Sequence, residues 1–313
     1  MGGRPELASG AGGPAIAPHP LPRFVPAAAV ALATVLAGCG TTSPEPLGQL
    51  FPDPALADCV AEATGLPGAA ADASRVDLGA LEELRCTGGT SVEGPVRSLE
   101  GLQELSALTV LDLSGNEIAD LTPLRELEHL GTLTLTRNAV SDLSPLIGLE
   151  LFDLGLSSNP VSDLSPLAGT TTLNALGVAA AQVTDVGPLA GHDALRELDL
   201  SGNAISDVAP LAGLPTLDTL RLAQNRITDP SPLGTIPTLL ILDVFGNRIA
   251  DVRGLAAAPL LQELQLGANP LTDLTPLLRV RSLVNLGLDE TDGTLLTGID
   301  QLRAAGVSVN GLA

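Results

Sequence analysis

The chain has 313 residues, with 36 acidic and 15 basic side chains and a formal net charge of −21 at pH 7. Such a surface repels phosphate, which excludes nucleic-acid binding through a basic face and attachment to an anionic bilayer by charge alone. Hydrophobic residues make up 45% of the chain, but they are mostly spaced singly, and no stretch after residue 40 approaches the roughly 18 consecutive apolar residues that cross a membrane.

Residues 1–38 have the features of an export signal. Arg4 and Arg23 precede an apolar run over residues 25–37, and small residues lead up to Cys39. The sequence Leu-Ala-Gly-Cys at residues 36–39 resembles the lipobox of bacterial lipoproteins, which implies cleavage before Cys39 and acylation of this cysteine. The alternative is a plain secretory signal that happens to be followed by a cysteine.

Residues 39–50 are rich in Thr, Ser, Pro and Gly, and this composition predicts a short tether. If Cys39 carries more than one acyl chain, the anchor is stable. The tether spans at most about 36 Å when fully extended, so the folded part is expected to stay close to the membrane.

Residues 51–80 are predicted to form a helical cap that covers the open end of a repeat array. Asp53 suits the N-cap of a helix, Pro54 suits its first position, and Gly65 ends it. A second short helical segment is expected around residues 78–84.

Residues 81–282 repeat one pattern, which is clearest in LTVLDLSGNEIADLTPL at residues 108–124. Counting Leu108 as position 1, apolar residues occupy positions 1, 4, 6, 11, 14 and 17. The frame returns every 22 residues, and once after 21, at Leu130, Leu151, Leu173, Leu195, Leu217, Leu239, Leu261 and, more loosely, Leu283. A fixed period of this length predicts an α/β solenoid of leucine-rich repeats.

Two polar positions recur within the frame, and both are expected to be structural. An amide at position 9 can satisfy backbone groups in a turn, and it is present at Asn116, Asn138, Asn159, Asn203, Asn225, Asn247 and Asn269. A carboxylate at position 13 can cap a short helix that contains proline, and it is present at Asp120, Asp142, Asp163, Asp185, Asp207, Asp229, Asp251 and Asp273. Stacked carboxylates are able to bind calcium, but their spacing does not require it, and no cofactor or metal is predicted.

One coil departs from this pattern. Ala181 replaces the asparagine within the run Val178-Ala179-Ala180-Ala181, so residues 173–186 are predicted to be the most mobile interior coil.

Over residues 51–290 the chain resembles the internalin family of bacterial surface proteins. The resemblance rests on the cap opening FPDPALA at residues 51–57, Asp77-Leu78, the junction SLEGL at residues 98–102, and repeats that end in Asp-Leu-x-Pro-Leu. It implies a right-handed superhelix with a concave parallel sheet, short 3₁₀ turns on the convex side, and recognition of another protein.

The remaining cysteines are Cys59 in the cap and Cys86 in the first repeat. In an exported protein this pair is expected to form a disulfide, and the alternative is two buried free thiols.

Positions 3 and 5 of each repeat point out of the concave face, flanked by positions 2, 7 and 8. The acidic character of these positions predicts a protein partner with a basic surface, and Ile241 and Phe245 are candidate apolar anchors. Phe152, at position 2, either faces a partner or packs against the neighbouring strand. The predicted partner-binding residues are Asp112, Asp153, Glu197, Asp199, Arg221, Ile241, Asp243, Phe245 and Glu263.

No catalytic motif accompanies these residues. The chain lacks hydrolase, nucleotide-binding and zinc-type spacings, and without Trp or Tyr it lacks the usual platform for glycan stacking. Residues 283–313 are predicted to form a degenerate last repeat and a C-terminal cap with a helix stopped by Gly306. We expect an exported, lipid-anchored and monomeric binding protein at the cell membrane or surface, with a host protein or an envelope protein as partner. The alternative is a structural envelope lipoprotein without a dedicated ligand.

Overall fold

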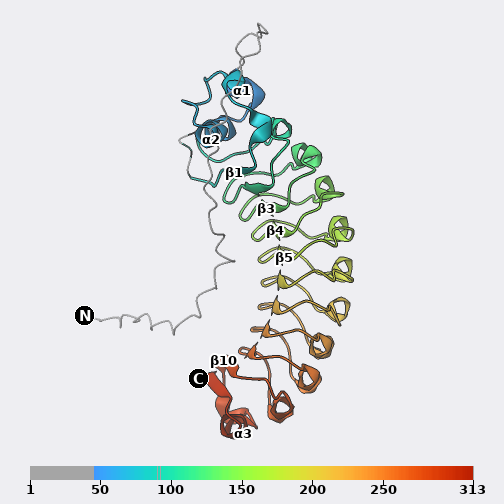
Figure 1. Ribbon diagram of the computed structural model, residues 1–313. Coiled ribbons are helices and arrows are strands. Elements are labelled where there is room, and N and C mark those ends of the chain that lie inside the picture. The colour runs from blue at the N-terminus through green and yellow to red at the C-terminus, as the bar shows by residue number, and fades with distance from the viewer. Residues whose placement is uncertain (1–45, 90, 92, 313) are drawn as a thin grey trace, which may run out of the picture. The chain divides into compact units, whose positions relative to one another are not determined.

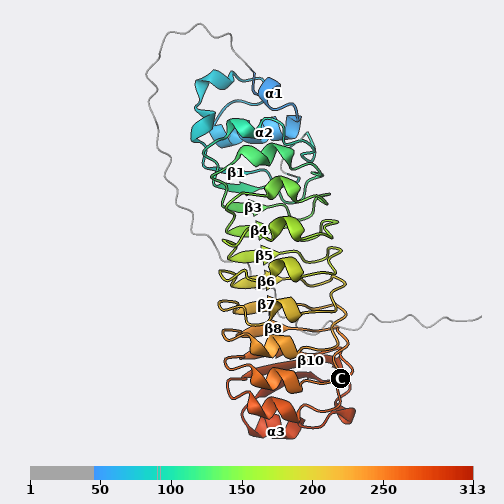
Figure 2. The same cartoon turned by 90° about the vertical axis from the view of Figure 1, so that its right-hand side faces the viewer.

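The computed structural model describes residues 46–312, apart from residues 90 and 92. The predicted signal peptide, Cys39 and most of the tether lie outside the described residues. The described part belongs to one compact unit, which curves into an arc with its strands along the inner side and short helices along the outer side (Figure 1). Turned by 90°, the same arc shows its helices in front of the strands (Figure 2).

A single parallel sheet of eleven strands, in chain order, runs through the described residues. Its register places the leucines at position 4 beside one another, as in Leu111, Leu133 and Leu154. The predicted leucine-rich-repeat solenoid with a concave parallel sheet is therefore confirmed. The strands are β1 Glu83–Arg85, β2 Val110–Asp112, β3 Thr132–Thr134, β4 Asp153–Gly155, β5 Ala175–Gly177, β6 Glu197–Asp199, β7 Thr219–Arg221, β8 Ile241–Asp243, β9 Glu263–Gln265, β10 Asn285–Thr291 and β11 Ser308–Leu312.

The convex side carries one 3₁₀ helix per coil, and in the eight coils with an aspartate at position 13 this residue holds the start of the helix, whereas the first helix, Leu102–Glu104, follows Gly101 without a side-chain cap. Asp120 accepts a hydrogen bond from the backbone N–H of Thr122 at 2.8 Å, and the other seven aspartates of this series repeat the bond at 2.7–2.9 Å. The predicted capping role is confirmed. These helices are η3 Leu102–Glu104, η4 Thr122–Glu126, η5 Ser144–Leu146, η6 Ser165–Leu167, η7 Gly187–Leu189, η8 Ala209–Leu211, η9 Ser231–Thr235, η10 Arg253–Ala257 and η11 Thr275–Arg279.

The core is a stack of leucines from successive coils. Leu198, Leu200 and Leu211 are each fully buried, as are their counterparts in neighbouring coils. Because each coil buries its apolar residues against the next, stability comes from contacts between neighbours along the array.

The asparagines at position 9 form the predicted ladder. Asn138 accepts a hydrogen bond from the N–H of Ile118 at 3.0 Å, and its amide donates to the carbonyls of Leu113 at 2.9 Å and Leu135 at 3.0 Å. One side chain thus satisfies backbone groups in two coils.

The N-terminal cap is built around Asp53. Helix α2, Pro54–Thr64, begins after this residue, whose Oδ1 accepts hydrogen bonds from the N–H groups of Ala55 and Leu56 at 3.0 and 3.1 Å. Its Oδ2 accepts from the N–H groups of Arg97 and Ser98 at 2.7 and 3.0 Å. One carboxylate therefore caps the helix and ties the cap to the first repeats.

The cap begins earlier than predicted. Residues 47–50 were assigned to the tether, but they form helix α1, Leu47–Leu50, in which Leu47 is fully buried. Gly101 fits against this segment, since a Cβ there would lie 2.3 Å from the carbonyl oxygen of Leu50. The second helical segment is shorter than expected. Of residues 78–84, only η2, Leu78–Ala80, is helical, and Leu84 lies in β1; a separate 3₁₀ turn, η1, Ala73–Arg75, precedes η2.

The C-terminal end replaces the usual convex turn with η12, Gly293–Leu295, and helix α3, Ile299–Ala304. Strand β11 pairs parallel with β10, so the last residues extend the sheet as well as cover its end.

A disulfide joins Cys59 of α2 to Cys86, just after β1. It closes a segment with a sequence separation of 27 residues and fixes the cap on the first coil. Among the described residues, no helix is long and apolar enough to cross a membrane.

Candidate functional site: the concave face

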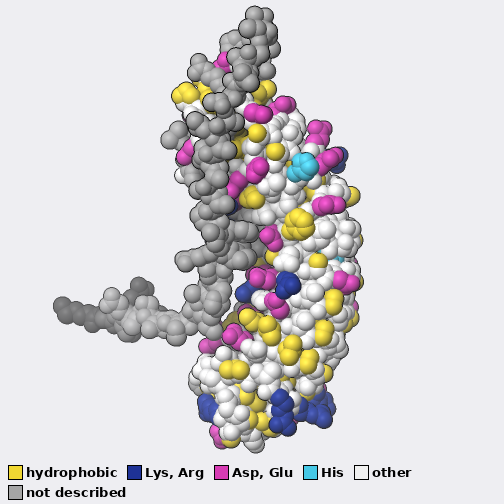
Figure 3. Space-filling view, in the orientation of Figure 1, with side chains coloured by type: hydrophobic (Ala, Val, Ile, Leu, Met, Phe, Trp, Pro, Cys, Tyr) yellow, Lys and Arg dark blue, Asp and Glu magenta, His cyan; other side chains and the backbone are white. Residues whose placement is uncertain are grey.

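The concave face is made by positions 3 and 5 of the strands, because position 4 between them points into the core. Strands β6 to β9 bring seven of the nine predicted partner-binding residues together, and we call this group the concave cluster. Figure 3 shows acidic and basic side chains gathered midway along the inner border of the arc. The concave cluster comprises Glu197, Asp199, Arg221, Ile241, Asp243, Phe245 and Glu263.

Arg221 lies at the centre of the cluster, between two carboxylates. The register places it beside Asp199 on one side and Asp243 on the other. Burial raises the pKa of Asp243, while the N–H of Phe245 and the charge of Arg221 act in the opposite direction. A second carboxylate, Asp199, adds to the upward shift. The cluster thus holds unneutralised acidic groups in a half-buried setting, where a basic group from a partner gains more than in open water.

The aspartates at position 5 also have a structural role that the sequence frame did not indicate. Asp199 accepts a hydrogen bond from the N–H of Ser201 at 3.0 Å, and Asp243 accepts one from the N–H of Phe245 at 2.9 Å. Each bond uses one carboxylate oxygen to hold the turn that leaves the strand. The other oxygen keeps its capacity to accept from a partner.

The apolar anchors differ in exposure. Ile241 and Phe245 are both half-buried, so they offer partial faces beside Asp243. Phe152 is 53% exposed, and its ring lies over Gly131, where a Cβ would approach the ring carbon Cδ2 to 3.0 Å. Phe152 therefore packs against the neighbouring coil with one side of its ring and leaves the rest of the side chain accessible.

The other two predicted residues lie apart from the concave cluster. Asp153 starts β4, where burial raises its pKa, and the uncharged strands β3 and β5 flank it. Asp112 ends β2, near the N-terminal end of the sheet.

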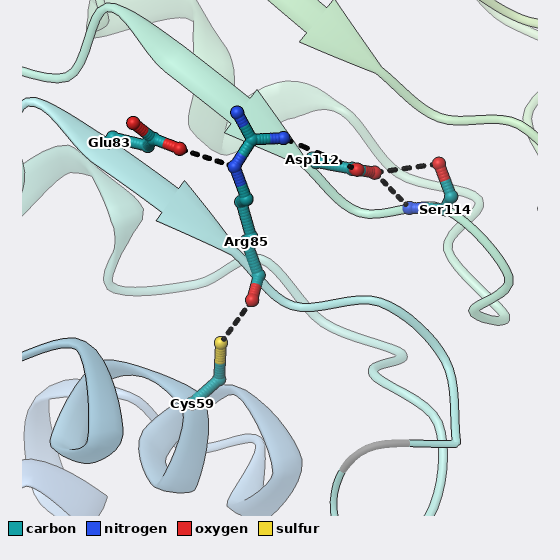
Figure 4. Close-up of polar contacts among 5 residues, drawn as sticks. All are labelled: Cys59, Glu83, Arg85, Asp112 and Ser114. Atoms are coloured by element: carbon teal, nitrogen blue, oxygen red, sulfur yellow. Dashed lines mark hydrogen bonds and ion pairs between the residues drawn. The ribbon is translucent and has the colours of Figure 1, made fainter. Parts of the chain in front are cut away.

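Asp112 belongs to a small network with Arg85 (Figure 4). The Arg85 guanidinium pairs with Glu83 and lies 3.9 Å from Oδ2 of Asp112, whose Oδ1 accepts hydrogen bonds from the N–H and hydroxyl of Ser114 at 3.0 and 2.6 Å. Sequence reasoning missed Glu83 and Arg85, although Leu84 at position 4 already placed them at positions 3 and 5. The carbonyl of Arg85 lies 3.3 Å from Sγ of Cys59, which links this network to the disulfide.

No group of three or more His, Cys, Asp or Glu side chains is arranged to hold a metal ion in the part of the chain that the structure describes. The concave face offers charges and partly exposed apolar groups, an arrangement suited to recognising another protein.

This fold and its broad concave surface define a leucine-rich-repeat protein. The family model for leucine-rich repeats (2 copies) matches residues 106–148 and 193–235. An internalin C2 from Listeria monocytogenes is 33% identical over 78% of this chain and 97% of its own, with a TM-score of 0.60. The chain therefore belongs to the internalin family.

Two further structures share the architecture. An internalin, InlF, from Listeria monocytogenes is 27% identical, with 86% of this chain and 92% of that chain covered and a TM-score of 0.68. The functional domain of InlJ from Listeria monocytogenes is 23% identical, covers 86% of this chain and 61% of its own, and has a TM-score of 0.59, which shows the fold alone. A comparison with curated protein sequences finds no match.

Proposed function

We propose that this internalin-like protein is an exported lipoprotein, anchored through Cys39, that binds a basic segment of another protein on the concave cluster. One observation carries the proposal. Glu197, Asp199, Asp243 and Glu263 project from three strands, β6, β8 and β9, around Arg221 on β7, with Ile241 and Phe245 beside them. Carboxylates with partly exposed apolar side chains beside them suit a segment in which Lys or Arg neighbours an apolar residue.

The role is binding and not catalysis, and the partner is a protein of the bacterial envelope. The family resemblance implies recognition of another protein. We place this partner in the bacterial envelope because the concave face is poor in the aromatic residues that dominate tight interfaces. A structural lipoprotein without a dedicated ligand is the second candidate, and it is favoured by the structural use of Asp199 and Asp243 in turns.

Capture of partners from envelope extracts, followed by crosslinking and identification, tests the binding role. We expect one basic partner, retained at low salt and lost at high ionic strength. Glu197→Lys with Asp199→Lys should abolish its capture, and Phe245→Ala should weaken it. Glu62→Lys with Glu100→Lys changes the net charge equally at exposed sites away from the concave face and should leave capture intact. Equal capture by all variants would refute the choice of surface.

The anchor is tested separately, since Cys39 lies outside the described residues. Cys39→Ala should move the protein from the membrane fraction to the soluble fraction. Retention of this variant at the membrane would contradict acylation as the anchor.

A further inference from the structure

A second surface lies on the flank along which each coil returns from its convex helix, a 3₁₀ helix or, in the last coil, α3, to the next strand. We call it the return flank. Position 20 is buried in nine successive coils, from Leu127 to Leu302, and the residue that follows it is exposed in every one. We call this row the flank column. Its members, in chain order, are Glu128, Glu150, Thr171, Asp193, Pro215, Pro237, Pro259, Arg281 and Arg303.

Hydrogen bonds next to the flank column keep the coils in register. The hydroxyl of Thr216 donates to the carbonyl of Leu195 at 2.9 Å, and that of Thr238 donates to the carbonyl of Leu217 at 2.9 Å. Thr172 and Ser282 make the equivalent bond to the preceding coil at 2.7 and 2.8 Å. The column is therefore an ordered row along the flank.

Charge is separated along this row. Its acidic members lie in the N-terminal half, prolines occupy the middle, and arginines end it. The neighbouring position 19 follows the same order, with Glu126 near one end and Arg279 near the other. Figure 3 views the return flank, with acidic side chains over the upper coils, hydrophobic ones further down and Lys or Arg side chains at the lower end.

These charges are not used within one molecule. The ion pairs found among the described residues join Arg85 to Glu83 and Asp112, Arg97 to Glu117, and Arg253 to Asp251. None involves a member of the flank column, so its carboxylates and guanidinium groups are free for another molecule.

We propose that the return flank is the interface of a two-fold homodimer whose symmetry axis passes through Pro215. This axis runs from the convex to the concave side of the arc. Rotation by 180° about it brings the two return flanks face to face, and the two flank columns then run in opposite directions. Pro215 then meets its own copy, Glu128 faces Arg303 of the second copy, and Glu150 faces Arg281. A two-fold interface must be self-complementary in this way.

Apolar groups support the same arrangement. Ile147 is 64% exposed and lies beside Glu150, while Leu260 is 46% exposed and follows Pro259. Ile147 lines a hollow of about 550 Å³ that also includes Pro166. In the dimer this hollow faces Leu260 and Arg281 of the second copy, which offers an apolar side chain for the hollow and a cation for Glu150.

The proposed dimer differs from the monomer expected from the sequence, and it is independent of the proposed function. Both concave faces point the same way and stay open. The net charge of −21 opposes association at long range, but salt at physiological concentration screens charges beyond about 8 Å, so the local pairs decide.

Sedimentation equilibrium of the full chain carrying Cys39→Ala, which cannot be acylated, tests the proposal. We expect the mass of two chains at micromolar concentration. Glu128→Arg with Glu150→Arg, or Arg281→Glu with Arg303→Glu, brings like charges together, and each should raise the dimer dissociation constant about a hundredfold or more. A monomeric parent chain, or reversed variants that dimerise as tightly as the parent, would overturn the proposal.

Mixing the two reversed variants distinguishes a lost interface from a lost fold. One variant then carries arginine and the other glutamate at all four sites, so their equimolar mixture should form a heterodimer although each alone is monomeric. A mixture that stays monomeric would also overturn the proposal. Arg226→Glu with Arg248→Glu matches the charge change of the second variant at exposed position 10, outside the return flank, and should leave the dimer unchanged.

Discussion

The side-chain oxygen of Asn225 accepts a hydrogen bond from the backbone N–H of Ile205, one coil earlier, at 3.0 Å. Its amide donates to the carbonyls of Leu200 at 2.9 Å and Leu222 at 3.1 Å. Asn225 is buried, so bulk water cannot replace its side chain as the partner of these backbone groups. The ladder therefore holds successive coils together through bonds that are costly to leave unmade.

Replacing Asn225 by alanine should lower the free energy of unfolding by about 2–3 kcal/mol, because the N–H of Ile205 then stays buried without an acceptor. Urea denaturation followed by circular dichroism measures the change. Asn285→Ala, on the concave row, is the matched control and should have a small effect. A loss below about 0.5 kcal/mol for Asn225→Ala would show that water replaces the side chain.

The coil that lacks this asparagine should gain from its restoration. Ala181 stands at position 9, and within the described residues the N–H of Val161, which an asparagine at 181 would bind, has no acceptor. Ala181→Asn should raise the free energy of unfolding by about 1 kcal/mol.

Hydrogen exchange provides a second readout for this coil. In the parent chain residues 173–186 should exchange fastest among the interior coils, and Ala181→Asn should slow them. Finding these residues among the best protected would contradict this account.

The repeat frame carried most of the fold, because most inward positions are occupied by Leu, Ile or Val in coil after coil. It also located the concave row, since strand residues alternate between faces. It did not show that Asp243 turns back to the N–H of Phe245, a bond that depends on the turn after the strand. Leu47 was misassigned for a similar reason, because its burial depends on contacts with a cap formed later in the chain.

The aspartates at position 13 should make stability depend on pH. Hydrogen bonds from the hydroxyl and N–H of Ser144 lower the pKa of Asp142, and those from the N–H and hydroxyl of Ser165 lower the pKa of Asp163. A carboxyl whose pKa is lower in the folded than in the unfolded chain stabilises the fold above the unfolded value of about 3.9, and this contribution is lost as pH falls through the folded value. The pKa is lowered in the same direction at Asp120, Asp229, Asp251 and Asp273.

Burial raises the pKa of Asp153 and Asp243, so these two favour folding when protonated, and their contribution is lost as pH rises through their raised values. Since the aspartates with lowered pKa values outnumber these two, the urea concentration at the unfolding midpoint should decrease as the pH is lowered below about 4. Asp142→Asn with Asp163→Asn should reduce the slope of the urea midpoint against pH in this range. An unchanged slope would assign the acid sensitivity to other groups.

The disulfide should stabilise the cap mainly by restricting the unfolded chain. With a sequence separation of 27 between Cys59 and Cys86, loop closure predicts a contribution of about 3–4 kcal/mol. Cys59→Ser with Cys86→Ser should therefore lower the urea midpoint and speed hydrogen exchange in α2 more than in the central coils. Titration of the unfolded, unreduced protein should find neither thiol free. Two free thiols would refute the bridge.

His192 occupies a core position where most other coils have an apolar residue, and it should be replaceable with a gain in stability. The side chain is fully buried, its Nε2 lies 3.1 Å from the carbonyl of Leu167, and its Nδ1 has no partner among the described residues. A carbonyl can only accept, so Nε2 carries the proton and Nδ1 is left as a buried acceptor without a donor. In His192→Leu the carbonyl of Leu167 keeps its bond from the N–H of Thr170 at 2.9 Å, so no polar group is left without a partner.

We expect His192→Leu to raise the free energy of unfolding by about 1 kcal/mol. His129→Leu, at an exposed position, is the control and should leave this free energy unchanged. A loss of stability in His192→Leu would mean that Nδ1 is satisfied by a bound water that leucine displaces.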